Sequence, residues 1–275
     1  MSFGTFDMKL FSDSVNYHCT LHQSKKDFPC LLMLHGFMGS EEVFKPLIKS
    51  LSEFCNPVTI DLAGHGKSQT PADSKHFSAE RQCRQLKSIL DRLQFKNLYL
   101  YGYSMGGRLA FQMVARYPEY FKGSVIESAH CGIRTEEVRR NRIRVDEERA
   151  QNIEENFKDF LLDWQQMPLF KHTPKREKTR YDEIMGSQDP ALMAASLRGF
   201  GAGVMPQVCD QISNSQIPIM LIAGALDKKY VDIMSDIGQS CDQAKLHIVK
   251  GAGHRVHTDR PDEMIKILKN CINQR

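Results

Sequence analysis

Short apolar runs alternate with stretches of helical periodicity along most of the 275-residue chain. A run such as 30–34 has the length and apolar character of a buried strand, whereas 83–93 places its apolar residues at helical spacing. Strands that alternate with helices are typical of parallel βαβ units, so the pattern predicts an α/β fold. The predicted strands are 6–10, 17–21, 30–34, 58–61, 98–101, 124–127, 217–223 and 246–249, and the predicted helices are 43–54, 83–93, 108–115, 231–240 and 262–270.

The pattern changes between residues 131 and 205, where the strand signal disappears. Arginine and acidic residues cluster in the first part of this stretch, and apolar residues then recur at helical spacing from Ile153 to Trp164. We predict a helical insertion (131–205) between two parts of an α/β core (1–130 and 206–275). Open α/β sheets bind ligands at the carboxyl ends of their strands, so we interpret the insertion as a lid over that edge.

Composition and charge narrow the class of protein. Hydrophobic residues make up 41% of the chain and charged residues 25%, which is typical of a globular protein, and the net charge of +4 is too small to indicate nucleic-acid binding. The first ten residues contain charges and no long apolar core, which is typical of neither a signal peptide nor a membrane anchor. The eight cysteines lack C-x-x-C spacing, so we expect free thiols and a cytoplasmic protein, with disulfides as the minority interpretation.

The stretch Gly102-Tyr103-Ser104-Met105-Gly106 carries the strongest chemical signal. It reads G-x-S-x-G, follows a predicted strand and precedes a predicted helix, which is the context of a nucleophile elbow. The glycines allow a sharp turn that exposes the serine hydroxyl at the end of the strand. Without these flanks, the motif would fit a plain glycine turn equally well. We therefore predict that Ser104 is an activated nucleophile.

An activated serine needs a histidine and an acid that orients it. Asp227 follows the predicted strand 217–223, and His254 follows the strand 246–249 within a glycine-rich turn. The chain order serine, acid, histidine is the one expected for this kind of elbow. The alternatives are that Asp227 is an ordinary turn aspartate and that the nearby His257 takes the place of His254. We predict the triad Ser104, Asp227 and His254.

Two backbone N–H groups should complete an oxyanion hole. Met105 follows the serine and supplies one, and Phe37, in the loop after strand 30–34, supplies the other. The alternative interpretation of His35-Gly36 is a simple turn that ends the strand. His65 is expected to stabilise a turn. The remaining histidines show no ligand spacing, so no metal site is predicted. Phosphate-binding glycine motifs are missing, so neither a nucleotide nor another cofactor is predicted.

Together, the motifs His35-Gly36-Phe37, Asp61-x-x-Gly-His-Gly-x-Ser, Gly-Tyr-Ser104-Met-Gly-Gly and Gly-His254 resemble the α/β-hydrolase superfamily across nearly the whole chain. The resemblance implies a mostly parallel central sheet with helices on both faces and a helical lid. It specifies the reaction weakly, because this scaffold carries esterases, C–C hydrolases, dehalogenases and lyases.

A narrower combination resembles one family of lyases, the 2-succinyl-6-hydroxy-2,4-cyclohexadiene-1-carboxylate synthases of menaquinone biosynthesis. It consists of Arg108 after the elbow, the stretch 127–133, Arg142-x-x-x-Asp146 and the motif from Asp163-Trp164 to Phe170. The resemblance implies elimination of pyruvate from a polycarboxylated cyclohexene through proton abstraction by the serine–histidine pair, without a cofactor.

The implied substrate carries several carboxylates, which suits the planar cations of arginine. The resemblance gives substrate-binding roles to Arg108, Arg142, Tyr103 and Trp164. Taken alone, Arg142 fits a solvated helix face better, Trp164 is more often a core residue, and Tyr103 suits either role. The partner expected from these residues is a small anionic molecule, while the oligomeric state is not readable from the sequence.

One departure from the family pattern concerns a third arginine. The family places it immediately before the segment that here begins at Gly186, where this chain has Met185, and Arg180 lies five residues earlier. A related enzyme with another acidic substrate therefore stays open. The runner-up function is a serine hydrolase of esters or C–C bonds with an acidic substrate, and the third is a non-catalytic binding protein on the same scaffold.

Overall fold

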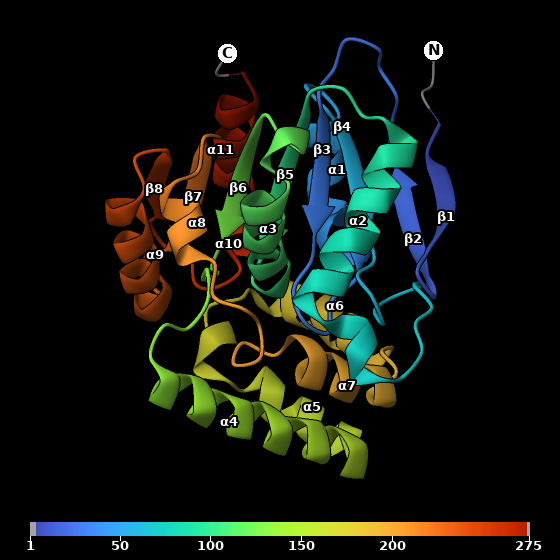
Figure 1. The fold of residues 1–275 in the computed structure, drawn as a ribbon, viewed down its shortest axis with the longest axis vertical. Helices are drawn as coiled ribbons and strands as arrows, with labels where there is room; N and C mark the ends of the chain where they lie inside the picture. Colours follow the sequence, from blue (N-terminus) through green and yellow to red (C-terminus); the bar gives the residue numbers. More distant parts are fainter. Residues whose placement is uncertain (1–3, 274–275) are drawn as a thin grey trace.

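An eight-stranded sheet forms the centre of the molecule in a computed structural model that describes residues 4–273 (Figure 1). The strand order is β1-β2-β4-β3-β5-β6-β7-β8, and β2 is antiparallel to both of its neighbours while the pairs from β4 to β8 are parallel. The expected α/β fold with a mostly parallel sheet is confirmed. The strands are β1 (Phe6–Ser12), β2 (Val15–Leu21), β3 (Cys30–Leu34), β4 (Asn56–Ile60), β5 (Leu98–Tyr103), β6 (Gly123–Glu127), β7 (Ile219–Gly224) and β8 (Ala244–Val249).

Helices cover both faces of this sheet, and the side chains of a single strand belong to two separate core layers, one on each face. In β3, Leu32 and Leu34 belong to one layer and Leu31 and Met33 to the other, as the two-residue period of a strand requires. All four are buried, which explains the uninterrupted apolar run in the sequence. The first layer packs under α2 (Ala79–Leu93), α3 (Met105–Arg116) and α9 (Lys228–Ser240), and the second under α1 (Lys45–Leu51) and α11 (Pro261–Asn273).

The chain between β6 and β7 contains helices and no strand in the part that the structure describes. We call residues 131–205 the helical segment. In Figure 1 its helices lie beyond the arrowheads of the parallel strands, so they face the carboxyl edge of the sheet. Its division from the core as a separate domain stays a prediction. The elements are α4 (Glu136–Glu155), α5 (Phe157–Gln165), η4 (Pro168–Phe170), α6 (Lys175–Gly186) and α7 (Pro190–Phe200).

Several short elements were not predicted. The expected helix 43–54 is divided into η1 (Glu41–Phe44) and α1, which begins at Lys45 with a proline in its first turn. Proline fits the first turn of a helix because its missing N–H would have no partner there. Within the described residues, no helix is both long and apolar enough to cross a membrane. The other short elements are η2 (Ser74–Phe77), η3 (Pro118–Tyr120), α8 (Cys209–Ser213) and α10 (Val256–Asp259).

The expectation of free thiols was wrong for two of the eight cysteines. Cys131 and Cys209 form a disulfide, with their Cα atoms 5.0 Å apart across 78 residues of sequence. Because the fold alone brings these two positions together, their spacing carried no signal. Cys131 lies shortly after β6 and Cys209 begins α8, so the bond joins the start of the helical segment to the short helix that follows it. The free cysteines are Cys19, Cys30, Cys55, Cys83, Cys241 and Cys271.

Candidate active site

Ser104 lies at the sharp turn between β5 and α3. Its φ of +52° is rare for a residue with a side chain, and the turn is held by the hydrogen bond from Ser104 N to Glu127 O (2.9 Å). Glycine is required at two flanking positions because a Cβ on Gly102 would lie 2.4 Å from Gly106 O, and one on Gly106 would lie 2.2 Å from Leu34 O. The G-x-S-x-G spacing thus has a steric cause in this fold.

The structure brings the three predicted triad residues together. His254 Nε2 lies 3.0 Å from Ser104 Oγ, and His254 Nδ1 lies 2.6 Å from Asp227 Oδ2. Asp227 follows β7 and occupies the position just before α9, while His254 lies in the turn after β8. The imidazole is 1% exposed, so its hydrogen bonds are shielded from water. This is the geometry of a serine activated by an oriented histidine.

His257, the competing histidine, belongs to a different buried network. Its Nδ1 lies 2.9 Å from Glu127 Oε1, and its Nε2 lies 2.8 Å from the Tyr181 hydroxyl. The Tyr101 hydroxyl also donates to Glu127. The ring of Tyr103 packs edge-on against both His254 and His257, so this network lies directly beneath the triad. The structure therefore engages His254, and not His257, with Ser104.

The predicted oxyanion donors lie at the start of α3 and in the loop after β3, at the same edge of the sheet. Met105 is the first residue of α3, and the first N–H groups of a helix have no partner within it. Phe37 follows His35, whose ring is locked because Nε2 accepts from Leu62 N (3.0 Å) and Nδ1 lies 2.8 Å from Gly36 O. Burial lowers the pKa of His35 to about 4, so the ring is neutral at neutral pH. Its two hydrogen bonds fix one tautomer of the ring and hold the loop in place.

A cavity of about 390 Å³ opens above Ser104. It is bounded by the core on one side and by α4, α5, η4, α6 and α7 of the helical segment on the other. All nine residues predicted from the sequence line it, namely Phe37, Tyr103, Ser104, Met105, Arg108, Arg142, Trp164, Asp227 and His254.

Arg108 lies one helical turn after Ser104 and is 8% exposed. Its Nη1 donates to Phe200 O (2.8 Å), and its guanidinium lies 5.0 Å from the centre of the Phe200 ring. Burial, with a further contribution from Arg142, lowers the pKa of Arg108 to about 10, so it is charged at neutral pH. No carboxylate pairs with Arg108 within the described residues. The charge is therefore available to an anion in the cavity.

Arg142 is held in place from its own helix. Its Nε donates to Asp146 Oδ1 (2.8 Å), and Asp146 also accepts from Arg149 Nη1 (3.5 Å) and from Ala202 N (3.1 Å). Both arginines line the cavity, and Arg149 also lies 5.3 Å from the Trp164 ring centre. One buried carboxylate thus holds two cations, which leaves an excess positive charge facing Ser104.

Sequence reasoning missed Arg149, His130, Lys229, Tyr230 and Arg255, all of which line the cavity. A signal existed for Arg149, because positions 142, 146 and 149 share one face of a helix. His130 had none. Burial, with Arg108 and Arg142, lowers the pKa of His130 to about 3, and its Nδ1 accepts from Gly132 N (3.1 Å). Neutral His130 therefore carries its proton on Nε2, as a donor.

The structure also shows whether Met185 or Arg180 contributes to the cavity. Met185 is buried in α6 and does not line the cavity. Arg180 does not replace the missing arginine, because it donates to Glu177 Oε2 (2.8 Å) and to Glu42 O (2.7 Å) outside the cavity. Neither residue of α6 supplies a cation to the site.

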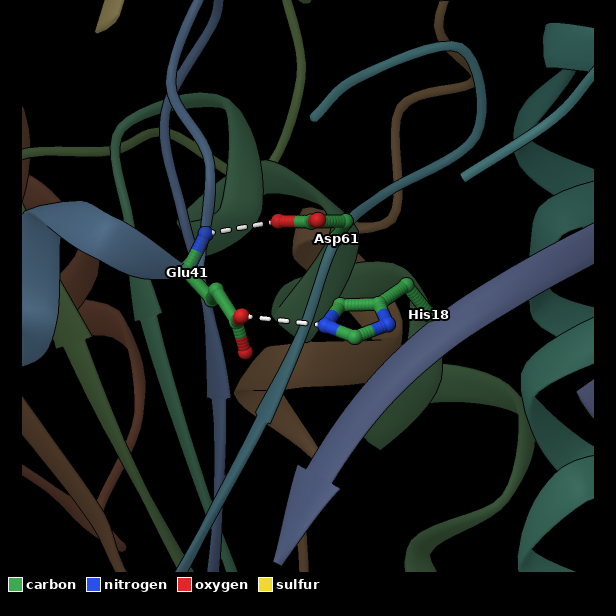
Figure 2. A group of neighbouring side chains, drawn as sticks. All are labelled: His18, Glu41 and Asp61. Atoms are coloured by element: carbon green, nitrogen blue, oxygen red, sulfur yellow. Dashed lines mark hydrogen bonds and ion pairs between the residues drawn. The ribbon is translucent and has the colours of Figure 1, made fainter. Parts of the chain in front are cut away.

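One group of side chains in the described part of the chain has the composition of a metal site: His18, Glu41 and Asp61 (Figure 2). It lies outside the cavity, and protein donors already occupy it. Lys67 Nζ lies 3.2 Å from Glu41 Oε1, and Asp61 accepts from Glu41 N (2.7 Å) and Lys67 N (2.8 Å).

Burial by itself raises the pKa of Glu41, but hydrogen bonds from two threonines, with His18 and Lys67, bring it down to about 2. Lys67 thus pairs with Glu41, and the group works as a structural network that ties the turn after β4 to η1 and β2. The prediction that the chain has no metal site stays a prediction.

Comparison with known proteins shows which family and which relatives this chain is similar to. A family model described as alpha/beta hydrolase fold matches residues 29–261. A protein of Bacillus subtilis (strain 168), provisionally named 2-succinyl-6-hydroxy-2,4-cyclohexadiene-1-carboxylate synthase, is 32% identical over 95% of this chain and 96% of its own length. The synthase of that name from Escherichia coli O1:K1 / APEC is 26% identical over 93% of this chain and 98% of its own. MenH from S. aureus has a similar structure, with a TM-score of 0.87 and 26% identity over 100% of this chain and 99% of its own.

Proposed function

This chain belongs to the alpha/beta hydrolase fold family, and on that premise we propose that it is a lyase of menaquinone biosynthesis. Its substrate is 2-succinyl-5-enolpyruvyl-6-hydroxy-3-cyclohexene-1-carboxylate, from which it eliminates pyruvate. The relatives in B. subtilis and E. coli carry the name of the synthase that forms the corresponding diene.

The observation that carries the proposal is the charge of the cavity above Ser104. Five cationic side chains line it, and Asp227, which is engaged with His254, is the one carboxylate that does so in the described residues. A neutral ester would form no ion pairs with these cations, whereas a substrate with three carboxylates can pair with several of them. The cations are Arg108, Arg142, Arg149, Lys229 and Arg255.

The reaction needs a base, a site for developing negative charge, and a departing enolpyruvate. The Ser104–His254 pair removes the proton from ring carbon 2, which lies next to the succinyl ketone. The electrons shift toward the ketone oxygen, where the N–H groups of Phe37 and Met105 stabilise the charge. The ring double bond then moves, the bond from carbon 5 to the ether oxygen breaks, and the departing enolpyruvate takes up a proton to become pyruvate. Asp227 stabilises the His254 imidazolium in between.

The helical segment acts as the lid in this proposal. Arg142, Arg149 and Trp164 belong to it and line the cavity, which supports a role in holding the substrate as well as covering it. Closing such a lid excludes water and so strengthens each ion pair between the arginines and the carboxylates.

The test is pyruvate release by the purified protein from the enolpyruvyl substrate, followed by the oxidation of NADH through lactate dehydrogenase. We expect Ser104→Ala to lower kcat by about a thousandfold, since acid–base catalysis contributes about 10² to 10⁴. Ser50→Ala, an exposed serine on α1, is the matched control and should keep full activity. Pyruvate formation no faster than the uncatalysed background would overturn the proposal.

The same preparation tests the serine hydrolase alternative. Turnover of simple aryl esters that disappears in Ser104→Ala, without pyruvate release from the enolpyruvyl substrate, would identify a hydrolase. The lyase should show little ester turnover, because its arginine-lined cavity offers a neutral ester no partner for those charges.

A further inference from the structure

Arg255, the residue immediately after His254, is a buried cation without a directly paired carboxylate in the described residues. It is 4% exposed and lines the cavity, and its Nε is buried without a hydrogen-bond partner. In the part of the chain that the structure describes, its guanidinium forms no ion pair with a carboxylate, and Asp182 and Asp259 act on it from beyond the distance of an ion pair. Burying a charge without a paired partner is unfavourable, so a residue of this kind is suited to bind an anion that enters the cavity.

Aromatic rings fix the position of this guanidinium. Its Cζ lies 3.6 Å from the centre of the Tyr181 ring and 4.0 Å from that of Phe170. Stacking uses the faces of a guanidinium and leaves its N–H edge available, which is the edge that binds a carboxylate with two parallel hydrogen bonds. The Phe170 ring also contacts His254 edge-on, so the site adjoins the triad.

Arg255 forms a second cationic region, separate from that of Arg108. The charged groups that act on Arg108 are Arg142 and Asp146. Burial raises the pKa of Tyr103, and the neighbouring Arg255 guanidinium opposes that rise. Arg255 therefore sits beside Tyr103, on the side of the cavity that faces α6, and a substrate with several carboxylates can reach both regions at once.

The position of Tyr103 links this region to the oxyanion hole. Its ring packs so closely on Gly36 that a Cβ at position 36 would lie 2.7 Å from it, and Phe37 is the next residue. A ketone whose oxygen lies at the N–H groups of Phe37 and Met105 can direct the chain attached to it past Tyr103 toward Arg255. We propose that Arg255 binds the terminal carboxylate of the succinyl chain, so that it selects substrates with a carboxylate at that distance from the ketone.

This inference rests on the proposed function for the identity of the substrate, but its test does not need turnover. The probe is 2-(3-carboxypropanoyl)benzoate, a stable aromatic molecule with the ring carboxylate, the ketone and the terminal carboxylate. Its partner, 2-acetylbenzoate, keeps the ring carboxylate and the ketone but lacks the terminal carboxylate. Calorimetry on the full-length protein gives the Kd of each probe for wild type, Arg255→Met and Arg255→Lys.

We expect Arg255→Met to weaken binding of the carboxypropanoyl probe by about 10- to 100-fold, the range for a lost charge-assisted hydrogen bond. Its Kd for 2-acetylbenzoate should change by less than about threefold, because that probe does not reach Arg255. Arg255→Lys keeps the charge without the planar fork and should lie between wild type and Arg255→Met, which also covers the case in which the methionine variant is poorly folded. Arg176→Met, an exposed position on α6, controls for the loss of one positive charge.

Equal losses for the two probes, an unchanged Kd of the carboxypropanoyl probe, or no binding of it to wild type would each overturn the proposal. The two proposals fail separately. Absence of pyruvate release together with Arg255-dependent probe binding would overturn the lyase and support the subsite, whereas pyruvate release with Arg255-independent binding would do the reverse.

Discussion

Asp146 holds the arginines of the helical segment, although nothing in its own chemistry touches the reaction. Its side chain is 4% exposed and accepts hydrogen bonds from Arg142 Nε, Arg149 Nη1 and Ala202 N. We predict that Asp146→Ala releases both arginines, whereas Asp146→Asn keeps one acceptor oxygen and so loses part of the network.

The magnitude follows from the contacts. A hydrogen bond to a charged group contributes about 1.5 to 3 kcal/mol, and Asp146 accepts two at 3.1 Å or less. Arg142 and Arg149 are 30% and 24% exposed, so water compensates part of their loss and the low end of the range applies. We expect Asp146→Ala to lower the free energy of unfolding by about 3 kcal/mol, which corresponds to a fall in Tm of about 6 to 12 °C.

The activity assay separates orientation from stability. At a temperature where the variant is folded, the KM for the enolpyruvyl substrate should rise at least about tenfold in Asp146→Ala, since 1.4 kcal/mol of lost binding is tenfold. Glu148→Gln is the matched control, because Glu148 pairs with Arg144 at the same i,i+4 spacing but both side chains are exposed. That pair should contribute less than about 0.5 kcal/mol. If Asp146→Ala and Glu148→Gln gave the same Tm and KM, the reasoning would be refuted.

Three further predictions concern the triad, acid stability and the disulfide. Asp227→Asn should lower the kcat of pyruvate release by about 10³ to 10⁴ with a similar KM, since His254 loses its orientation, and a loss below about tenfold would contradict the triad. Burial lowers the pKa of His35, His65 and His130 below the unfolded value of 6.5. Below pH 6.5 the unfolded chain therefore binds protons that the folded protein does not, and stability is lost as the pH falls from 6.5 toward 3 or 4. His130→Gln should therefore take up about one proton fewer on unfolding at pH 5, measured from the slope of stability against pH, and equal slopes would count against this. Reduction should lower the unfolding free energy of wild type by about 4 kcal/mol in denaturant titrations, because a cross-link across 78 residues constrains the unfolded chain, and should leave Cys131→Ser/Cys209→Ser unchanged. A reductant without effect on wild type would argue against a formed bond.

Local patterns made most of the sheet predictable. Buried parallel strands are uninterrupted apolar runs, so β3 was predicted with the bounds Cys30–Leu34 that the structure has. The elbow and the turn before His254 carry glycines for steric reasons, which marks both positions in the sequence. Asp227 could be found because parallel strands end at the same edge, where the residues that follow them meet.

The rest depends on contacts between distant parts of the chain. Cys131 meets Cys209 because β6 and β7 are neighbours in the sheet, and their spacing in the sequence does not reveal this. Arg255 was overlooked beside His254, because an isolated arginine in a loop looks like any exposed cation until Tyr181 and Phe170 are seen around it. Sequence patterns indicate faces of elements, but the partner of each face is set by packing.

The disulfide between Cys131 and Cys209 changes how the helical segment can move. A cover that swings as one rigid body needs its two chain crossings to separate or twist relative to each other. Here the crossings are fastened, with Cα atoms 5.0 Å apart, so they behave as a single pivot. We expect entry of a substrate as wide as a substituted ring to depend on rearrangement between α4 and the α5–η4 stretch that carries Trp164 and Phe170. Arg142 and Arg149 are held by Asp146 on the same helix, and Asp146 is tied to the chain after α7 by Ala202 N. The substrate would then enter where the aromatic residues of α5 and η4 move, while the arginines of α4 keep their positions.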